Sequence, residues 1–282
     1  MSRYLIIATL LWQQLSARHY SYTLQKALSL HVVKASAKSL GGYQGFCMQV
    51  NIENLSNDSL VILVEAGRRL LAGNKDEQDI LVVKESPIAL RRHEKKSQTI
   101  KGYCCQASKH APTAATTYAI NQLADSALVK VAQNLSKNCF GSEVEQDAVW
   151  AISDKKPIAS IPNTNDSANL VLRQLLADIK GEKLPWYTIT KNTFVTQGGQ
   201  IMQVNQYLCG KLTYNNMQKA YGTLLVYNDK GLEVCIIKSE WLDIGNNLPF
   251  QINLPVKGLE KGKYSLVLQT REREVLKEAF EI

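Results

Sequence analysis

The chain has few of the residues from which metal and phosphate sites are built. Its 282 residues include only four histidines, His19, His31, His93 and His110, and none is spaced from another or from a cysteine as metal ligands are. No glycine-rich loop leads into a helix, so a phosphate-binding loop is not predicted. We therefore expect no metal and no cofactor, and we do not predict an enzyme.

Long hydrophobic runs are also scarce. At the amino terminus Arg3 precedes an apolar stretch at residues 5–12 and a small-residue segment at 15–17, the order found in export signals. Residues 1–17 are therefore predicted to be a signal peptide, the alternative being a short buried amino-terminal element. The stretch is too short to cross a bilayer and no later segment is apolar enough, so no transmembrane segment is predicted. We expect an exported protein, in the periplasm, at the cell surface or outside the cell.

The positive charge of the chain is not gathered in one place. Lysine and arginine number 33 against 25 acidic residues, which gives a net charge of +8. The densest run, residues 91–96, lies between the apolar residues 88–90 and the strand-like residues 97–100, and it contains no aromatic residue on which a base could stack. It is typical of the tip of a β-hairpin, and no nucleic-acid partner is predicted.

Residues 25–111 have the pattern of short β-strands separated by polar turns. Phe46, Met48, Val50 and Ile52 alternate with more polar residues, as in a strand with one buried face. Further strands are expected at 60–64, 80–83 and 97–105. This spacing favours an immunoglobulin-like β-sandwich.

The middle of the chain, residues 112–185, is predicted to be helical. Ile120, Leu128 and Val131 follow helical spacing in the first helix, Ser142 and Glu145 form a capping-box pattern that opens the second, and Gly181 ends the third. Residues 186–282 return to β patterns and predict a C-terminal immunoglobulin-like sandwich. The expected fold is thus mixed and mainly β, with a three-helix middle segment.

Six cysteines are present, and two of them are adjacent, Cys104 and Cys105. In an exported protein they would meet an oxidising compartment where disulfides are permitted. If the strands that contain Cys47 and Cys105 are neighbours, a disulfide between these two residues becomes geometrically allowed. The sequence leaves the connectivity open.

Two short motifs resemble the thioester domains of bacterial surface adhesins. Cys104 follows the aromatic Tyr103, and Gln146 begins the sequence Gln-Asp-Ala-Val-Trp that ends at Trp150. The resemblance implies an internal thioester between Cys104 and Gln146 that acylates an amine or hydroxyl on a partner surface. Cys105 departs from the pattern, because an aromatic residue is expected there.

Two other roles for these residues stay open. Gln146 and Trp150 are four positions apart, so they share one helix face and could simply pack that helix against the first β domain. Alternatively, Cys104 or Cys105 could form a thiol–imidazole pair with His110 in a cryptic cysteine hydrolase.

The carboxy-terminal stretch carries a second resemblance. Residues 226–231, residues 259–266 and Lys277 are similar to the sorting domain that Bacteroidetes append to proteins exported by the type IX machine. This resemblance covers about the last sixty residues, and it implies a small sandwich that directs export or surface attachment.

Together these features predict an exported, non-enzymatic binding or adhesion protein whose partner is an unknown protein or glycan at a cell surface.

Overall fold

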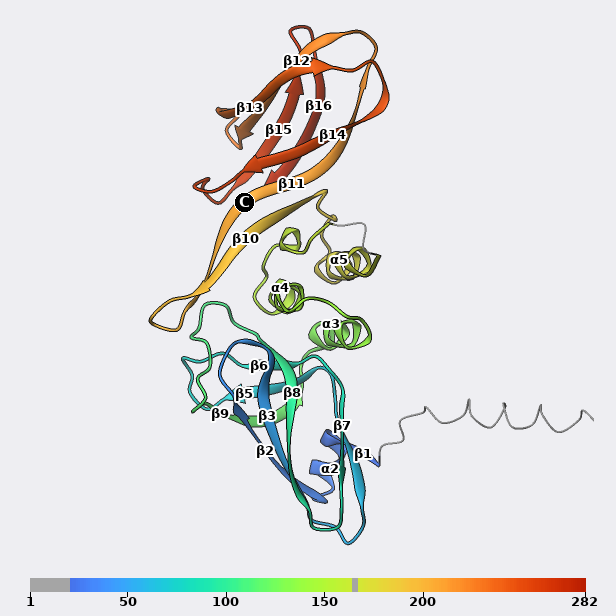
Figure 1. The fold of residues 1–282 in the computed structure, drawn as a ribbon, viewed down its shortest axis with the longest axis vertical. Coiled ribbons are helices and arrows are strands. Elements are labelled where there is room, and N and C mark those ends of the chain that lie inside the picture. Colours follow the sequence, from blue (N-terminus) through green and yellow to red (C-terminus); the bar gives the residue numbers. More distant parts are fainter. Residues whose placement is uncertain (1–20, 164–166) are drawn as a thin grey trace, which may run out of the picture.

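The computed structural model describes residues 21–163 and 167–282. Three parts follow one another along its long axis: an N-terminal barrel, a layer of helices and a C-terminal pair of sheets (Figure 1). The expected mainly β class is confirmed. The predicted signal peptide, residues 1–17, lies outside the described residues. Within the described ranges, none of the helices has the length and hydropathy that crossing a membrane requires.

The N-terminal part is a closed antiparallel barrel, which replaces the immunoglobulin-like sandwich expected for residues 25–111. Closure depends on the strand β9 (Thr117–Leu123), which pairs with both β2 (Val33–Ser39) and β5 (Arg68–Ala72) and so leaves the barrel without a free edge. In order around the barrel, the strands are β2 (Val33–Ser39), β3 (Gln44–Asn54), β8 (Lys95–Cys104), β6 (Ile80–Val82), β5 (Arg68–Ala72) and β9 (Thr117–Leu123).

A small sheet and a short helix extend the barrel at one end (Figure 1). The sheet has the order β1 (Tyr22–Thr23), β4 (Leu60–Val64) and β7 (Ser86–Leu90), and β1 leads directly into α2 (Leu24–Ser29). The fully buried side chains of Leu24 and Ile62 belong to the same core as the barrel residues Met48 and Val50. The small sheet and the barrel are therefore one folding unit.

A β-bulge interrupts the alternation predicted for β3. Met48, Val50 and Ile52 are buried as expected, but Phe46 is 67% exposed and Cys47 is buried. The register with β8 shifts between Gly45 and Met48, so one extra residue reverses which side chains face the core.

The first predicted helix begins later than the spacing suggested. Residues 117–123 form strand β9, and α3 (Ser126–Lys137) starts only after Asp125, whose carboxylate accepts hydrogen bonds from the N–H groups of Ala127 and Leu128. A capping aspartate of this kind fixes the first turn of a helix. The second and third predicted helices are confirmed as α4 (Ser142–Ser153) and α5 (Ser167–Lys180).

The helices form a layer between the barrel and the C-terminal sheets (Figure 1). Their core combines Leu128, Val149 and Leu172 with the barrel residues Leu81 and Tyr103. The layer also contains the 3-10 turn η1 (Ile158–Ser160). Because one hydrophobic cluster spans the two parts, the helices are fixed on the end of the barrel.

The C-terminal part consists of two antiparallel sheets that share one core. One sheet has the order β10 (Tyr187–Val195), β11 (Ile201–Asn216) and β14 (Gly245–Pro255). The other has the order β13 (Glu233–Leu242), β12 (Ala220–Asn228), β15 (Lys263–Gln269) and β16 (Glu274–Glu281). Ile189 and Leu208 belong to this core, so the last sixty residues do not enclose a core without β10 and β11.

Candidate functional site

The structure brings Cys104 and Gln146 together at the junction of the barrel and the helices. Cys104 is the last residue of β8, and Gln146 lies in the second turn of α4. The side-chain amide of Gln146 donates to the Cys104 carbonyl, with 2.8 Å between Nε2 and O, and its Oε1 accepts from the Cys104 N–H at 3.2 Å. Both residues are buried. The amide is therefore held against the cysteine by two directional contacts.

Helix α4 is fixed in this position by an ion pair with the same strand. The Lys101 ammonium lies 2.6 Å from Oε2 of Glu145, whose side chain is only 2% exposed. Lys101 belongs to β8, the strand that ends at Cys104, and Glu145 precedes Gln146 in α4. This ion pair therefore fixes the position of the helix along the strand. The position of Gln146 thus depends on the helix as a whole and not on its own hydrogen bonds alone.

Trp150 lies one turn after Gln146 and anchors the helix in the barrel. Its side chain is 1% exposed and belongs to the barrel core, and its ring stacks on Tyr43 with 6.4 Å between centroids and 5° between planes. The Tyr43 carbonyl also accepts a hydrogen bond from the Cys104 N–H. Tyr43 therefore contacts both motifs, although it lies far from each in the sequence.

Burial keeps the Cys104 thiol in its protonated form. Desolvation, followed by the nearby Cys47, raises the pKa of Cys104 well above its ordinary value. The adjacent Cys105 faces the helical core, where burial raises its pKa to about 12. A buried, protonated thiol is a poor nucleophile toward external substrates.

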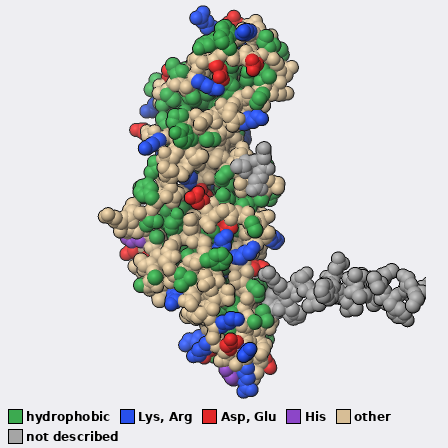
Figure 2. Space-filling view, in the orientation of Figure 1, with side chains coloured by type: hydrophobic (Ala, Val, Ile, Leu, Met, Phe, Trp, Pro, Cys, Tyr) green, Lys and Arg blue, Asp and Glu red, His purple; other side chains and the backbone are tan. Residues whose placement is uncertain are grey.

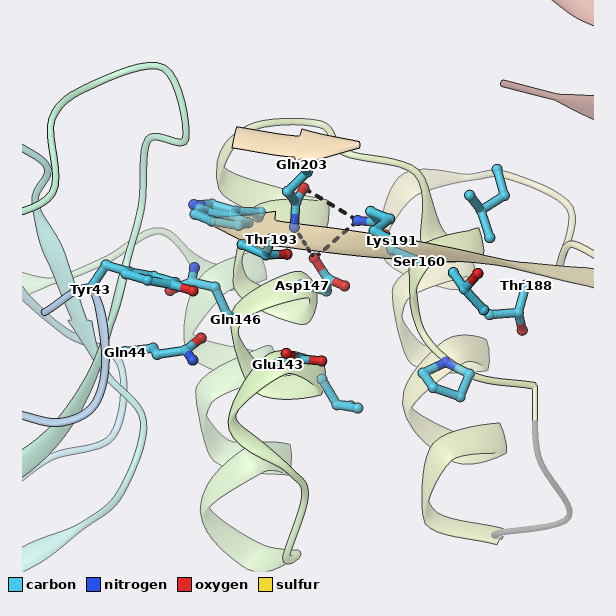
Figure 3. A pocket seen from close by; sticks show the side chains of 15 residues that line it. Tyr43, Gln44, Glu143, Gln146, Asp147, Ser160, Thr188, Lys191, Thr193 and Gln203 are labelled. Carbon is cyan, nitrogen blue, oxygen red and sulfur yellow. Dashed lines mark hydrogen bonds and ion pairs between the residues drawn. The ribbon is translucent and has the colours of Figure 1, made fainter. Parts of the chain in front are cut away.

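A cleft of about 190 Å³ opens beside Gln146, between α4 and the strands β10 and β11. Figure 3 shows Tyr43, Gln44 and Gln146 at one side of this cleft and Asp147, Lys191 and Gln203 at another. Gln146 contributes to the lining of this cleft although the residue is only 2% exposed.

A polar cluster closes the far side of the cleft. The Lys191 ammonium lies 3.2 Å from Oδ1 of Asp147 and 3.3 Å from Oε1 of Gln203, and the Gln203 amide donates to the same Asp147 oxygen (Figure 3). Burial is the main reason that the pKa of Lys191 is lowered, and the Asp147 carboxylate opposes that shift. The cluster joins the C-terminal sheet to the residue next to Gln146.

The predicted disulfide between Cys47 and Cys105 is not formed. All six cysteines lie in the described part of the chain, and each is a free thiol. Strands β3 and β8 are neighbours, as the prediction required, but Cys47 belongs to the barrel core whereas Cys105 belongs to the helical core. The bulge turns Cys47 inward, where its thiol donates to the Gly102 carbonyl.

His110 forms hydrogen bonds through its backbone. Its N–H donates to the Asp76 carbonyl and its own carbonyl accepts from Gln78, and no hydrogen bond in the described ranges joins its ring to Cys104 or Cys105. The described residues also contain no group of three His, Cys, Asp or Glu side chains that could hold a metal ion.

Several residues of the site were not identified from the sequence. Tyr43 lies in the turn before β3 and Gln44 is the first residue of β3, whereas Lys191 and Gln203 come from a hairpin of the C-terminal part. Only the motif at Gln146 signalled this region, because the other residues converge through tertiary contacts.

The chain matches no known protein-family model, no curated protein and no solved structure.

Proposed function

We propose that this chain is an exported surface-binding protein that attaches covalently to its partner through an internal thioester between Cys104 and Gln146. The observation that carries the proposal is the paired contact of the Gln146 amide with Cys104, 42 residues away in the sequence. The resemblance to adhesin thioester domains involves the same two residues.

The proposed chemistry is two acyl transfers. In the first, Sγ of Cys104 bonds to Cδ of Gln146, the bond between Cδ and the amide nitrogen breaks, and the thiol proton leaves with that nitrogen as ammonia. In the second, an amine or hydroxyl of the partner bonds to Cδ, the C–S bond breaks, and the partner's proton returns to Sγ. The result is an amide or ester to the partner and a free Cys104 thiol.

Burial of the pair supports storage of such a bond. A thioester carries no charge, so an environment that disfavours the Cys104 thiolate does not disfavour the thioester. Exclusion of water also limits its hydrolysis. The cleft beside Gln146 is too small for a folded domain, so a partner would reach the acyl group with a single side chain or sugar hydroxyl.

The C-terminal sheets support the binding part of the proposal. One sheet consists of β10, β11 and β14, and the other consists of β12, β13, β15 and β16. This division of the strands is compatible with an immunoglobulin-like sandwich. We propose that this module contacts a protein or glycan at the cell surface and that it also serves in sorting or surface attachment. Such modules present loops at their ends as binding surfaces.

The intact mass of the purified exported chain tests the thioester. We expect the wild-type protein to be lighter by one ammonia than its mature sequence requires, and the Cys104→Ala variant to have the full mass. Cys105→Ala is the matched control, because it removes the neighbouring thiol, which faces a different core. This variant should keep the deficit.

Two outcomes oppose the proposal. A wild-type mass equal to the sequence mass would mean that Gln146 only binds the backbone at the end of β8, as in the simple packing interpretation. A deficit that persists in Cys104→Ala would place the lost ammonia elsewhere in the chain.

A further inference from the structure

A second concave surface lies at the outer end of the C-terminal part, away from the helices. It is a groove of about 660 Å³, formed where the turns β11–β12 and β15–β16 meet the end of β13. The chain ends at the opposite end of this part, beside β10 and β11 (Figure 1). The groove is therefore remote from Cys104 and Gln146, and its function is separable from theirs.

Two exposed aromatic rings line this groove. Tyr221 is 51% exposed and Trp241 is 62% exposed, although large apolar side chains are normally placed in the core. They are directly paired across β12 and β13 and meet edge to face, with 5.4 Å between centroids. Figure 2 shows that hydrophobic side chains are interspersed with charged ones over the surface of the C-terminal part.

Neighbouring contacts hold these rings in place. The Lys219 ammonium lies 5.4 Å from the centre of the Trp241 ring, and the Tyr221 hydroxyl donates to the Ser239 carbonyl. A cation near an aromatic face stabilises the orientation of the ring. The apolar wall of the groove is thus formed before any ligand arrives, which reduces the entropy lost on binding.

The remaining wall is polar and contains both donors and acceptors. Gln269 and Thr223 supply an amide and a hydroxyl, and Arg271 supplies a guanidinium. On the opposite turn the Gln218 amide donates to the Glu272 carboxylate at 3.0 Å, which joins the two turns. Groups of both charge signs occur here, so the groove does not have the uniform charge of a site for a phosphate or a polycation.

We propose that this groove binds an oligosaccharide built from β-linked, gluco-configured pyranoses. Such rings carry C–H groups on both faces and hydroxyls around the rim. The C–H groups pack on the exposed aromatic surface that Tyr221 and Trp241 present to the groove, and the hydroxyls, which donate and accept at once, pair with the amide, hydroxyl and charged groups of the opposite wall. The volume lies in the range of sites for small ligands, which favours a short glycan over a folded protein.

Calorimetric titration of the full chain with cellohexaose and with triacetylchitotriose tests the proposal. We expect at least one of the two sugars to bind at a single site and to shift the fluorescence of the exposed Trp241. Trp241→Ala and Tyr221→Ala should each weaken binding by about tenfold or more. Leu232→Ala is the matched control, because Leu232 is 61% exposed in the turn at the other end of the same sheet.

The result that would overturn the proposal is absence of binding by the wild-type chain for both sugars. Equal binding by the wild type and Trp241→Ala would also overturn it. The fluorescence shift is measured on the wild type, so the test does not depend on the folding of a variant. The Cys104→Ala protein should bind the sugar normally, which separates this site from the proposed thioester.

Discussion

The side-chain amide of Gln146 forms hydrogen bonds with both backbone groups of Cys104, donating to the carbonyl at 2.8 Å and accepting from the N–H at 3.2 Å. These contacts involve the backbone of residue 104, so they do not depend on its thiol. In a Cys104→Ala background no thioester can form, and the contribution of the amide to stability can be measured alone.

In that background we expect Gln146→Glu to lower the free energy of unfolding by about 1–3 kcal/mol. The carboxylate cannot donate, so it would place a buried oxygen against the carbonyl of residue 104. Urea denaturation at neutral pH measures the difference. Gln44→Glu changes a residue of the same cleft and should alter stability by less than about 0.5 kcal/mol. Equal stability with and without Gln146→Glu would show that the paired contact contributes nothing.

Arg173 of α5 joins the helical layer to the start of β10. Its side chain is fully buried, and its guanidinium donates to the carbonyls of Ile161, Pro185 and Tyr187. Burial lowers its pKa to about 10, which leaves it charged at neutral pH. Arg173→Lys should cost about 2 kcal/mol or more in chemical denaturation, because the guanidinium reaches the three carbonyls from two nitrogens, whereas an ammonium has all its donors on one. Arg271→Lys, at an exposed position, is the control, and a similar cost in both variants would contradict this account.

Gly102 permits close packing between β8 and β6. A Cβ atom at this position would lie 2.5 Å from Cγ2 of Ile80 and 3.4 Å from Cγ of Met48. Gly102→Ala should therefore overpack the barrel and lower the free energy of unfolding by about 1–3 kcal/mol. Gly141→Ala, where an added Cβ meets nothing within 4 Å, is the comparison. Thermal denaturation of both variants checks the prediction, and it fails if Gly102→Ala is as stable as the wild type.

Cys105 should make the protein less stable at alkaline pH. Burial is the main cause that raises its pKa from 9.0 to about 12, so the thiol ionises more easily in the unfolded chain. Its contribution to stability is fully present below pH 9 and is lost as the pH rises toward 12. Cys105→Ala should make this decline shallower, by up to about 1.4 kcal/mol per pH unit. Urea denaturation from pH 8 to 10.5 measures the slope, which the exposed Cys139→Ala should leave unchanged.

Local patterns predicted the elements whose burial is decided by near neighbours in the sequence. The alternation at Met48, Val50 and Ile52 identified β3, a capping-box pattern identified α4, and helical spacing identified α5. The barrel could not be predicted in this way, because β9 closes it by pairing with β2 and β5, which lie far back in the chain. The bulge before Met48 was missed for a similar reason, since it is defined by the register with β8.

The candidate site likewise contains residues that local motifs predicted and residues that only tertiary packing brings together. Cys104 and Gln146 were proposed from short motifs, and the structure places them in contact. Tyr43 and Lys191 carry no local signal. They reach the site because the turn before β3 and the C-terminal hairpin fold onto α4, which only tertiary packing decides.

Peptide mapping after treatment with methylamine tests the thioester most directly. The account predicts that methylamine converts Gln146 to its N-methyl amide and frees the Cys104 thiol. Because both thiols are buried in the folded chain, alkylation is carried out after unfolding: both Cys104 and Cys105 should then be alkylated in the treated protein, and only Cys105 in the untreated protein. An unmodified Gln146, with Cys104 equally reactive before and after treatment, would contradict it.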